Sequence, residues 1–247
     1  MLAIIGGSGL TQLSTLEVLR REVARTPYGE PSGALTFGRL AGREVVFLAR
    51  HGYGHTIPPH RVNYRANIWA LKNAGADSIV SVASVGGIRR DCVPGALVVP
   101  DQILDYTWGR AHTFSDRIDT LVRHIDFTIP YDEGVRCRIF RAAREAGVEM
   151  IDGAVYAATQ GPRLETAAEI DRFERDGADL VGMTGMPEAA LARELELPYA
   201  AINVVSNYAA GRETSAQNVH FECIEQVLQE AMLRVRNVLA HICADCK

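Results

Sequence analysis

Small polar donors stand directly after several apolar stretches of the sequence, where a buried strand would end. Arginine offers a planar fork of N–H donors that matches phosphate oxygens, and glycine turns bring backbone N–H groups close to an anion. Each donor alone could belong to an ordinary structural turn, but their repetition predicts a binding site for phosphate. These donors are Ser8 in the turn Gly6-Gly7-Ser8-Gly9, the pair Arg50-His51, Ser84 in Ala83-Ser84-Val85-Gly86-Gly87, and Thr184.

The glycine turn matches neither of two common nucleotide-binding motifs. No Gly-Lys-Ser/Thr follows Gly9, so it is not a Walker A loop, and its glycines lack the spacing of the dinucleotide fingerprint. Taken alone, it could be an ordinary tight turn.

The elements that must position these donors alternate between short apolar runs and helical patterns. No linker or repeat interrupts them, which indicates one α/β domain, residues 1–247, on a mixed, largely parallel sheet flanked by helices. In such sheets ligands bind at the carboxyl ends of the strands. Strands are expected at residues 3–5, 35–40, 44–49, 78–85, 96–100, 155–159, 180–183 and 199–206, and helices at 62–73, 133–146, 166–176, 187–195 and 223–240. The strands at 35–40 and 44–49 are expected to form a hairpin, and Thr166 and Glu169 a capping box.

Two long stretches are expected to be irregular. Residues 21–31 are largely polar, and residues 107–132 show no periodicity, which predicts a long loop or lid. Cys243-Ala-Asp-Cys246 has redox-like or metal-like spacing without a second ligand pair, so residues 241–247 are expected to form a loose tail.

Composition excludes some classes of partner. The chain has 247 residues, 26 basic and 30 acidic, a net charge of −4 and no basic block, which argues against nucleic acid. The sequence shows no charged leader typical of a signal peptide and no apolar run long enough to span a membrane. A cytoplasmic location is therefore expected.

Taken together, several motifs resemble the trimeric purine nucleoside phosphorylases, and most closely the branch of 5′-methylthioadenosine and S-methyl-5′-thioinosine phosphorylases. The resemblance runs from about residue 3 to residue 240. It implies phosphorolysis, in which inorganic phosphate replaces a purine at C1′ of a nucleoside, without metal or organic cofactor. The motifs are Gly6-Gly7-Ser8-Gly9-Leu10, Ala49-Arg50-His51-Gly52, residues 62–71, Gly161-Pro162-Arg163-Leu164-Glu165-Thr166 and Gly182-Met183-Thr184-Gly185-Met186-Pro187-Glu188.

The resemblance also implies a role for individual residues. Met183 would pack on the ribose and donate its backbone N–H to a hydroxyl, while Leu164, Tyr208 and Ala209 would contact the substrate. Asn207, Arg50 and His51 would be catalytic. Phosphate would be held by Ser8, Arg50, His51, Ala83, Ser84 and Thr184. Ala83 is a departure, because relatives commonly carry Thr or Asn there, and one side-chain donor is missing at this position; Ser84, which follows it, could compensate.

Two positions indicate the base. Asn207 and Ala209 stand where adenosine-cleaving relatives resemble Asp-x-Asp, and an amide can donate to O6 while accepting from N7–H. Glu165 can accept the N1–H that a 6-oxopurine carries. Glu165 could instead be a charge at a helix start and Asn207 a turn residue, but both substitutions favour a hypoxanthine-type base.

Two interpretations of the substrate's 5′ group, a methylthio group or a hydroxyl group, are compatible with the sequence. His55, Pro59 and His60 resemble the branch that closes an apolar pocket over a methylthio group, and His124 matches a residue donated by the neighbouring subunit of a homotrimer. His220 could instead bind a 5′-hydroxyl, or be a surface residue, and Val219, His220 or Phe221 could face the pocket. S-methyl-5′-thioinosine is the preferred substrate, and inosine or guanosine the alternative; methylthioadenosine is less favoured.

Two other classes of function compete with phosphorolysis. A non-catalytic nucleoside-binding protein would bind without releasing base. A nucleoside hydrolase would need a carboxylate cluster for calcium and water in place of Arg50-His51.

Overall fold

The computed structural model describes residues 1–116 and 122–244, and an eleven-stranded sheet organises them. Most strands follow the order β2-β3-β4-β1-β5-β10-β9-β7, while β11 pairs with β5 and β6, and β6 pairs with β8. The strands are β1 (Leu2–Gly6), β2 (Glu17–Glu22), β3 (Leu35–Leu40), β4 (Arg43–Ala49), β5 (Ser78–Gly87), β6 (Leu97–Val99), β7 (Gln102–Asp105), β8 (Ile151–Asp152), β9 (Val155–Ala158), β10 (Leu180–Gly182) and β11 (Tyr199–Tyr208).

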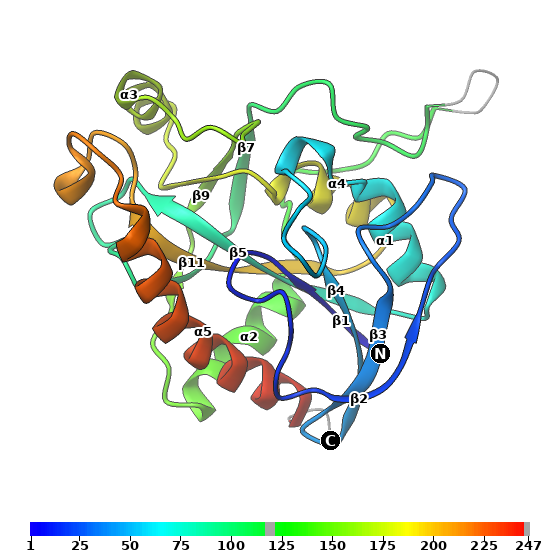
Figure 1. Cartoon of the computed structure of the whole chain (residues 1–247). Helices are drawn as coiled ribbons and strands as arrows, with labels where there is room; N and C mark the ends of the chain where they lie inside the picture. Colours follow the sequence, from blue (N-terminus) through cyan, green and yellow to red (C-terminus); the bar gives the residue numbers. More distant parts are fainter. Residues whose placement is uncertain (117–121, 245–247) are drawn as a thin grey trace.

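Helices cover both faces of the sheet. Figure 1 shows α2 and α5 on one side and α1 and α4 on the other. The helices are α1 (Tyr64–Asn73), α2 (Glu133–Glu145), α3 (Ala167–Arg175), α4 (Gly185–Glu194) and α5 (Phe221–Ala244), with short 3₁₀ turns at Pro59–Arg61 and Glu213–Ser215. The expected single-domain α/β fold with a mixed, largely parallel sheet is confirmed.

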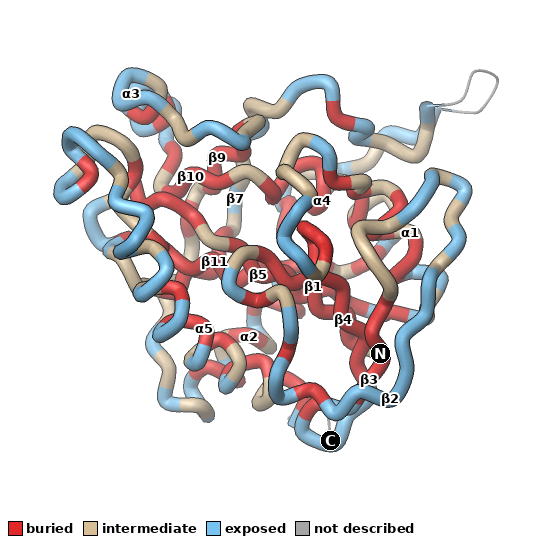
Figure 2. The backbone as a smooth tube through the Cα atoms, in the orientation of Figure 1, coloured by how far each residue is buried: buried red, intermediate tan, exposed pale blue. Residues whose placement is uncertain are grey.

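The centre of the sheet is built from β1, β5 and β11, whose apolar residues are buried on both faces (Figure 2). On one side β5 pairs with β1 through Ser78–Ser81 and with β10 through Gly86 and Gly87. On its other side β5 pairs with β11, which runs parallel to it from Ile79 to Gly87. Because β1, β4, β5 and β11 run parallel, their carboxyl ends lie at one edge of the sheet.

Local signals explain several element boundaries. The expected hairpin at residues 35–49 is present as β3 and β4. Thr166 and Glu169 form the expected capping box at the start of α3, each side chain bonding the other residue's backbone N–H. The described residues of the expected loop, 107–116 and 122–132, contain no helix or strand.

The structure corrects three expectations. Arg21 and Glu22, expected in a loop, end β2, a fully exposed strand at the edge of the sheet, where polar residues are tolerated. The short strands β7 and β8 were not anticipated. Residues 241–244, expected in a loose tail, continue α5, with Ile242 and Cys243 buried. Residues 245–247 lie outside the described part of the chain.

The α5 extension follows from its apolar spacing. Leu228, Met232, Val235, Leu239 and Ile242 recur every three or four residues and are all buried against the α2 side of the sheet. Because Ile242 continues this period, the helix does not end at residue 240.

Candidate active site

A cavity of about 660 Å³ lies at the carboxyl ends of β1, β4, β5, β10 and β11. Most residues expected to bind phosphate or nucleoside line it, although they come from distant parts of the chain. Those brought together are Ser8, Arg50, His51, His55, Pro59, Ala83, Ser84, Leu164, Glu165, Met183, Thr184, Asn207, Ala209 and Val219. The common cavity required by the sequence analysis is present.

Four expected residues lie outside the described lining of this cavity, one of which is the half-buried His60. His220 is exposed just before α5, and His124 is exposed in the long loop of the same chain. Tyr208 is half-buried, and its backbone carbonyl, rather than its ring, meets the site by accepting from Asn207 Nδ2 at 2.7 Å. The side chains of His220 and Tyr208 are therefore not placed to contact a ligand in this cavity.

Arg50 occupies one end of the cavity and is 1 % exposed. Its Nε and Nη2 donate to the two carboxylate oxygens of Glu188 at 2.7 and 2.8 Å. Nη2 also donates to Ser81 Oγ, and Nη1 to the Val82 carbonyl. Of the five guanidinium hydrogens, these bonds leave one on Nη1 for a ligand.

Glu188 is fully buried and holds this guanidinium in place. It accepts hydrogen bonds from Arg50, from Ser81 Oγ at 3.0 Å and from Tyr199 Oη at 2.8 Å. Burial by itself would lower the pKa of Arg50, but the adjacent Glu188 carboxylate more than offsets it and raises that pKa. The arginine is therefore charged and fixed before any ligand binds.

Gly7 is needed for this arrangement. A Cβ placed on Gly7 would lie 2.6 Å from the Val82 carbonyl oxygen and 2.7 Å from Arg50 Nη1. The glycine turn thus lets the β1 backbone pass close to the guanidinium.

His51 is neutral in this setting. Burial and the charge of Arg50 lower the pKa of His51 to about 4. Its Nδ1 lies 2.8 Å from the Ile57 carbonyl oxygen, so Nδ1 carries the proton and donates it there. Nε2 is therefore an acceptor, suited to a hydroxyl group such as the P–OH of hydrogen phosphate. The centroid of the His55 ring lies 4.8 Å from that of His51, with the two planes tilted by 49°, and His55 Nε2 is 3.4 Å from Ser8 Oγ.

The other end of the cavity presents an amide and a carboxylate. Ser206 Oγ donates to Asn207 Oδ1 at 2.8 Å, and Asn207 Nδ2 donates to the Tyr208 carbonyl. Since only a nitrogen can face that carbonyl, the amide orientation is defined, with one Nδ2 hydrogen and one Oδ1 lone pair remaining. Thr159 Oγ1 donates to Glu165 at 2.6 Å, and burial raises the pKa of Glu165.

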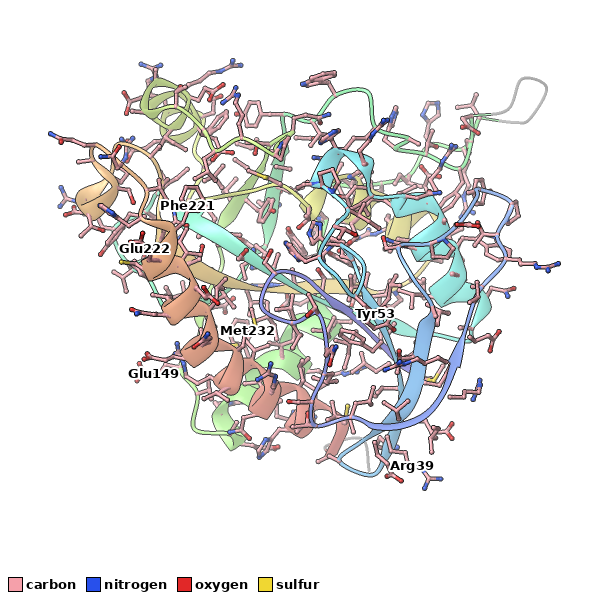
Figure 3. The ribbon with its side chains drawn as sticks, viewed as in Figure 1. Arg39, Tyr53, Glu149, Phe221, Glu222 and Met232 are labelled. Carbon is pink, nitrogen blue, oxygen red and sulfur yellow. The ribbon has the colours of Figure 1, made fainter. Side chains whose placement is uncertain are left out.

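A third wall of the cavity is apolar. Val219 and the α5 residues Phe221, Ile224 and Leu228 form it together with Ile57 and Pro58. Figure 3 shows Phe221 at the first turn of α5 and Met232 farther along the helix. A group that contacts this wall would be apolar, such as a thioether methyl.

Several supporting residues were missed by sequence reasoning. Arg110 is 8 % exposed and anchors the long loop to the site. It donates to the backbone carbonyls of Thr159, Gln160, Met183 and Met186. Glu188 stood inside a quoted motif, but only the fold brings it to Arg50.

The fold and this cavity define an α/β protein with an anion-binding end and a base-binding end in one site. Residues 1–244 match the Phosphorylase superfamily. The chain belongs to this superfamily, as the sequence motifs indicated.

Individual relatives are similar over nearly the full length. A probable S-methyl-5′-thioinosine phosphorylase of Pseudomonas syringae pv. tomato is 55 % identical over 241 residues, 97 % of each chain. A 6-oxopurine nucleoside phosphorylase of Pyrococcus furiosus is 44 % identical over 246 residues, covering 98 % of this chain and 91 % of the relative.

A solved structure shares the fold. The methylthioadenosine phosphorylase of Schistosoma mansoni in complex with adenine matches with a TM-score of 0.93 and 33 % identity. The match covers 98 % of this chain and 90 % of that one.

Among the described residues, no helix is both long and apolar enough to cross a membrane.

Proposed function

We propose that the chain catalyses the phosphorolysis of S-methyl-5′-thioinosine, giving hypoxanthine and 5-methylthioribose 1-phosphate. The observation that carries the proposal is one cavity with three chemically distinct ends: Arg50 and Ser8, the Asn207–Glu165 pair, and the apolar wall at Phe221. The relatives named S-methyl-5′-thioinosine phosphorylase support it.

In this proposal phosphate lies at the Arg50 end, below C1′ of the ribose. The remaining Arg50 N–H, Ser8, Thr184 and backbone N–H groups at Ala83-Ser84 donate to its oxygens, and His51 Nε2 accepts from its hydroxyl. As the glycosidic bond breaks, positive charge develops on the ribose, and the phosphate dianion stabilises it and then bonds to C1′. Positioned groups of this kind each lower the barrier by about 2–4 kcal/mol.

The leaving purine takes the bonding electrons and needs stabilisation at its other edge. As it leaves, the purine takes up a proton from water at N7; Asn207 Nδ2 donates to O6, Oδ1 accepts from the new N7–H, and Glu165 accepts from N1–H. Met183 packs on the ribose, and its N–H donates to a ribose hydroxyl. The proposal requires no metal or organic cofactor, so the rate should survive dialysis against a chelator.

The apolar wall favours methylthio over hydroxyl at the 5′ position. His220, the residue that could have bound a 5′-hydroxyl, is exposed and lies outside the described lining. Glu165 is the sole carboxylate among the described lining residues, which disfavours a calcium-dependent hydrolase. The proposed setting is purine salvage in the cytoplasm.

The test measures free purine released from methylthioinosine, inosine, guanosine and methylthioadenosine, each with and without phosphate. We expect phosphate-dependent release, with the highest kcat/KM on methylthioinosine. Release without phosphate would indicate a hydrolase, and binding without release a non-catalytic protein. A clear preference for inosine would reject the assignment of a methylthio group at the 5′ position. A clear preference for methylthioadenosine would reject the assignment of a 6-oxopurine base.

A further inference from the structure

Asn203, in the middle of β11, has an unusual side chain. It is fully buried, and neither Oδ1 nor Nδ2 has a hydrogen-bond partner among the described residues. An unpaired buried amide is costly, and most buried polar groups in native proteins are satisfied. A ligand is one way in which such an amide gains partners.

Asn203 is not itself among the described residues that line the cavity, but it lies directly behind one of them, Ala83, so its carboxamide must turn past Ala83 to reach a ligand. In the parallel β5–β11 ladder Asn203 is paired directly with Ala83, which lines the cavity. Paired residues project from the same face of a sheet. Ser81 and Tyr199 share this face, and both donate hydrogen bonds to Glu188.

The one unused hydrogen of Arg50 lies on the other side of Ala83, toward Gly7 just after the end of β1. A Cβ built on Gly7 would lie 2.7 Å from Arg50 Nη1 and 3.4 Å from Ala83 Cα, so these two atoms lie near each other. Ala83 offers only a methyl group there. The carboxamide of Asn203 is longer than that methyl group, on the adjacent strand and on the same face.

We propose that Asn203 is a further phosphate-binding residue, whose Nδ2 donates to the anion past the Ala83 methyl group. The donor that β5 lacks at Ala83 is then supplied by β11. This inference rests on the proposed phosphorolysis for the identity of the anion.

The first test replaces the amide by an apolar side chain of similar size, Asn203→Leu. Because the amide has no protein partner, its replacement should leave the unfolding temperature unchanged or higher. The KM for phosphate should rise about 10-fold, while the KM for methylthioinosine changes less than twofold. Phosphate should also raise the unfolding temperature less in the variant than in the parent.

The second test moves the donor across the strand pair. Asn203→Ala alone should raise the KM for phosphate, and the double variant Ala83→Asn with Asn203→Ala should return it to within about threefold of the parent. Asn67 provides a matched control: it is also fully buried, but it bonds Ser32 through both amide atoms. Asn67→Leu should lower the unfolding temperature and leave the KM for phosphate unchanged.

An unchanged KM for phosphate in Asn203→Leu would overturn the inference. So would equal losses for phosphate and nucleoside without recovery in the double variant, since these indicate packing alone. If Asn203→Leu yields no folded protein, Asn203→Ala and the double variant decide by the same readouts. If the parent releases no hypoxanthine, the proposed function fails, and the phosphate-induced shift in unfolding temperature still decides whether Asn203 binds the anion.

Discussion

At the scale of single residues, the proposed preference for a 6-oxopurine depends on Asn207. Its Nδ2 faces the Tyr208 carbonyl at 2.7 Å, so a carboxylate introduced there would meet that oxygen and have a raised pKa. A protonated acid could donate to the purine ring, and its other oxygen could accept from a 6-amino group.

We therefore expect Asn207→Asp to shift preference toward adenine. The ratio of kcat/KM for methylthioinosine to that for methylthioadenosine should fall at least about 10-fold, or about 1.4 kcal/mol. Steady-state rates on both nucleosides measure the ratio. Asn207→Ala serves as the control, because it should slow both substrates without inverting the preference.

His51 gives a prediction about pH and stability. Burial and Arg50 lower the pKa of His51 from its model-peptide value of 6.5 to about 4. Below pH 6.5 the His51 side chain of the unfolded chain binds a proton, whereas that of the folded chain stays neutral. The contribution of neutral His51 to the free energy of unfolding is therefore fully present above pH 6.5 and is lost as the pH falls toward 4.

Relative to His51→Asn, the parent should lose on the order of 3 kcal/mol of unfolding free energy between pH 6.5 and 4. Denaturant unfolding at several pH values measures the difference between the two proteins. Parallel pH profiles for parent and variant would show that His51 is not buried as a neutral group.

At the scale of secondary-structure elements, α4 fixes the anion-binding arginine that follows β4. Glu188 on α4 is the buried counter-charge of Arg50, while Ser81 on β5 and Tyr199 on β11 complete its hydrogen bonds. Removing one partner of a buried pair leaves an uncompensated charge.

Glu188→Gln should therefore lower the unfolding free energy by about 3–5 kcal/mol and abolish most phosphate-dependent activity. Thermal and denaturant unfolding measure the first effect. Glu174→Gln removes one of the two exposed carboxylates that pair with the half-buried Arg212 and should change stability little. Equal effects of the two substitutions would contradict the role assigned to Glu188.

The sequence predicted the elements that carry strong local signals. The glycine turn, the β3–β4 hairpin and the α3 capping box are present, because turn chemistry and capping are local. The polar edge strand β2 was missed, since an exposed strand is stabilised by its pairing with β3 rather than by an apolar pattern. The end of α5 was misplaced although Ile242 continues its apolar period.

At the site, most residues that line the cavity could be predicted from the sequence. The residues that hold those lining residues in place could not. Ser8, Arg50 and Asn207 stand at strand ends or in recognisable motifs. Glu188 and Arg110 act through partners far away in the sequence, and Asn203 meets Ala83 only across a ladder; these neighbours come together only in the folded chain.

At the scale of the whole molecule, the resemblance predicts a homotrimer in which His124 reaches a neighbouring active site. His124 is exposed and outside the described lining of its own chain's cavity, as such a role would require. The trimer itself remains a prediction.

Subunit mixing tests this arrangement. His124→Ala and Asn207→Ala should each lose about 10-fold or more in kcat/KM, an effect of about 1.4 kcal/mol. Coexpressed together, they should recover part of the parent activity, because some sites then combine an intact Asn207 with an intact His124 from the neighbour. Light scattering should give the mass of three chains; a monomer, or no recovery in the mixture, would reject the assignment.

The buried partner of Arg50 also determines how ionic strength should act on the enzyme. Since Glu188 cancels the guanidinium charge and His51 is neutral, phosphate meets oriented dipoles rather than a net positive field. Added potassium chloride would therefore weaken phosphate capture only slightly, and turnover should be nearly the same in dilute buffer and at physiological salt.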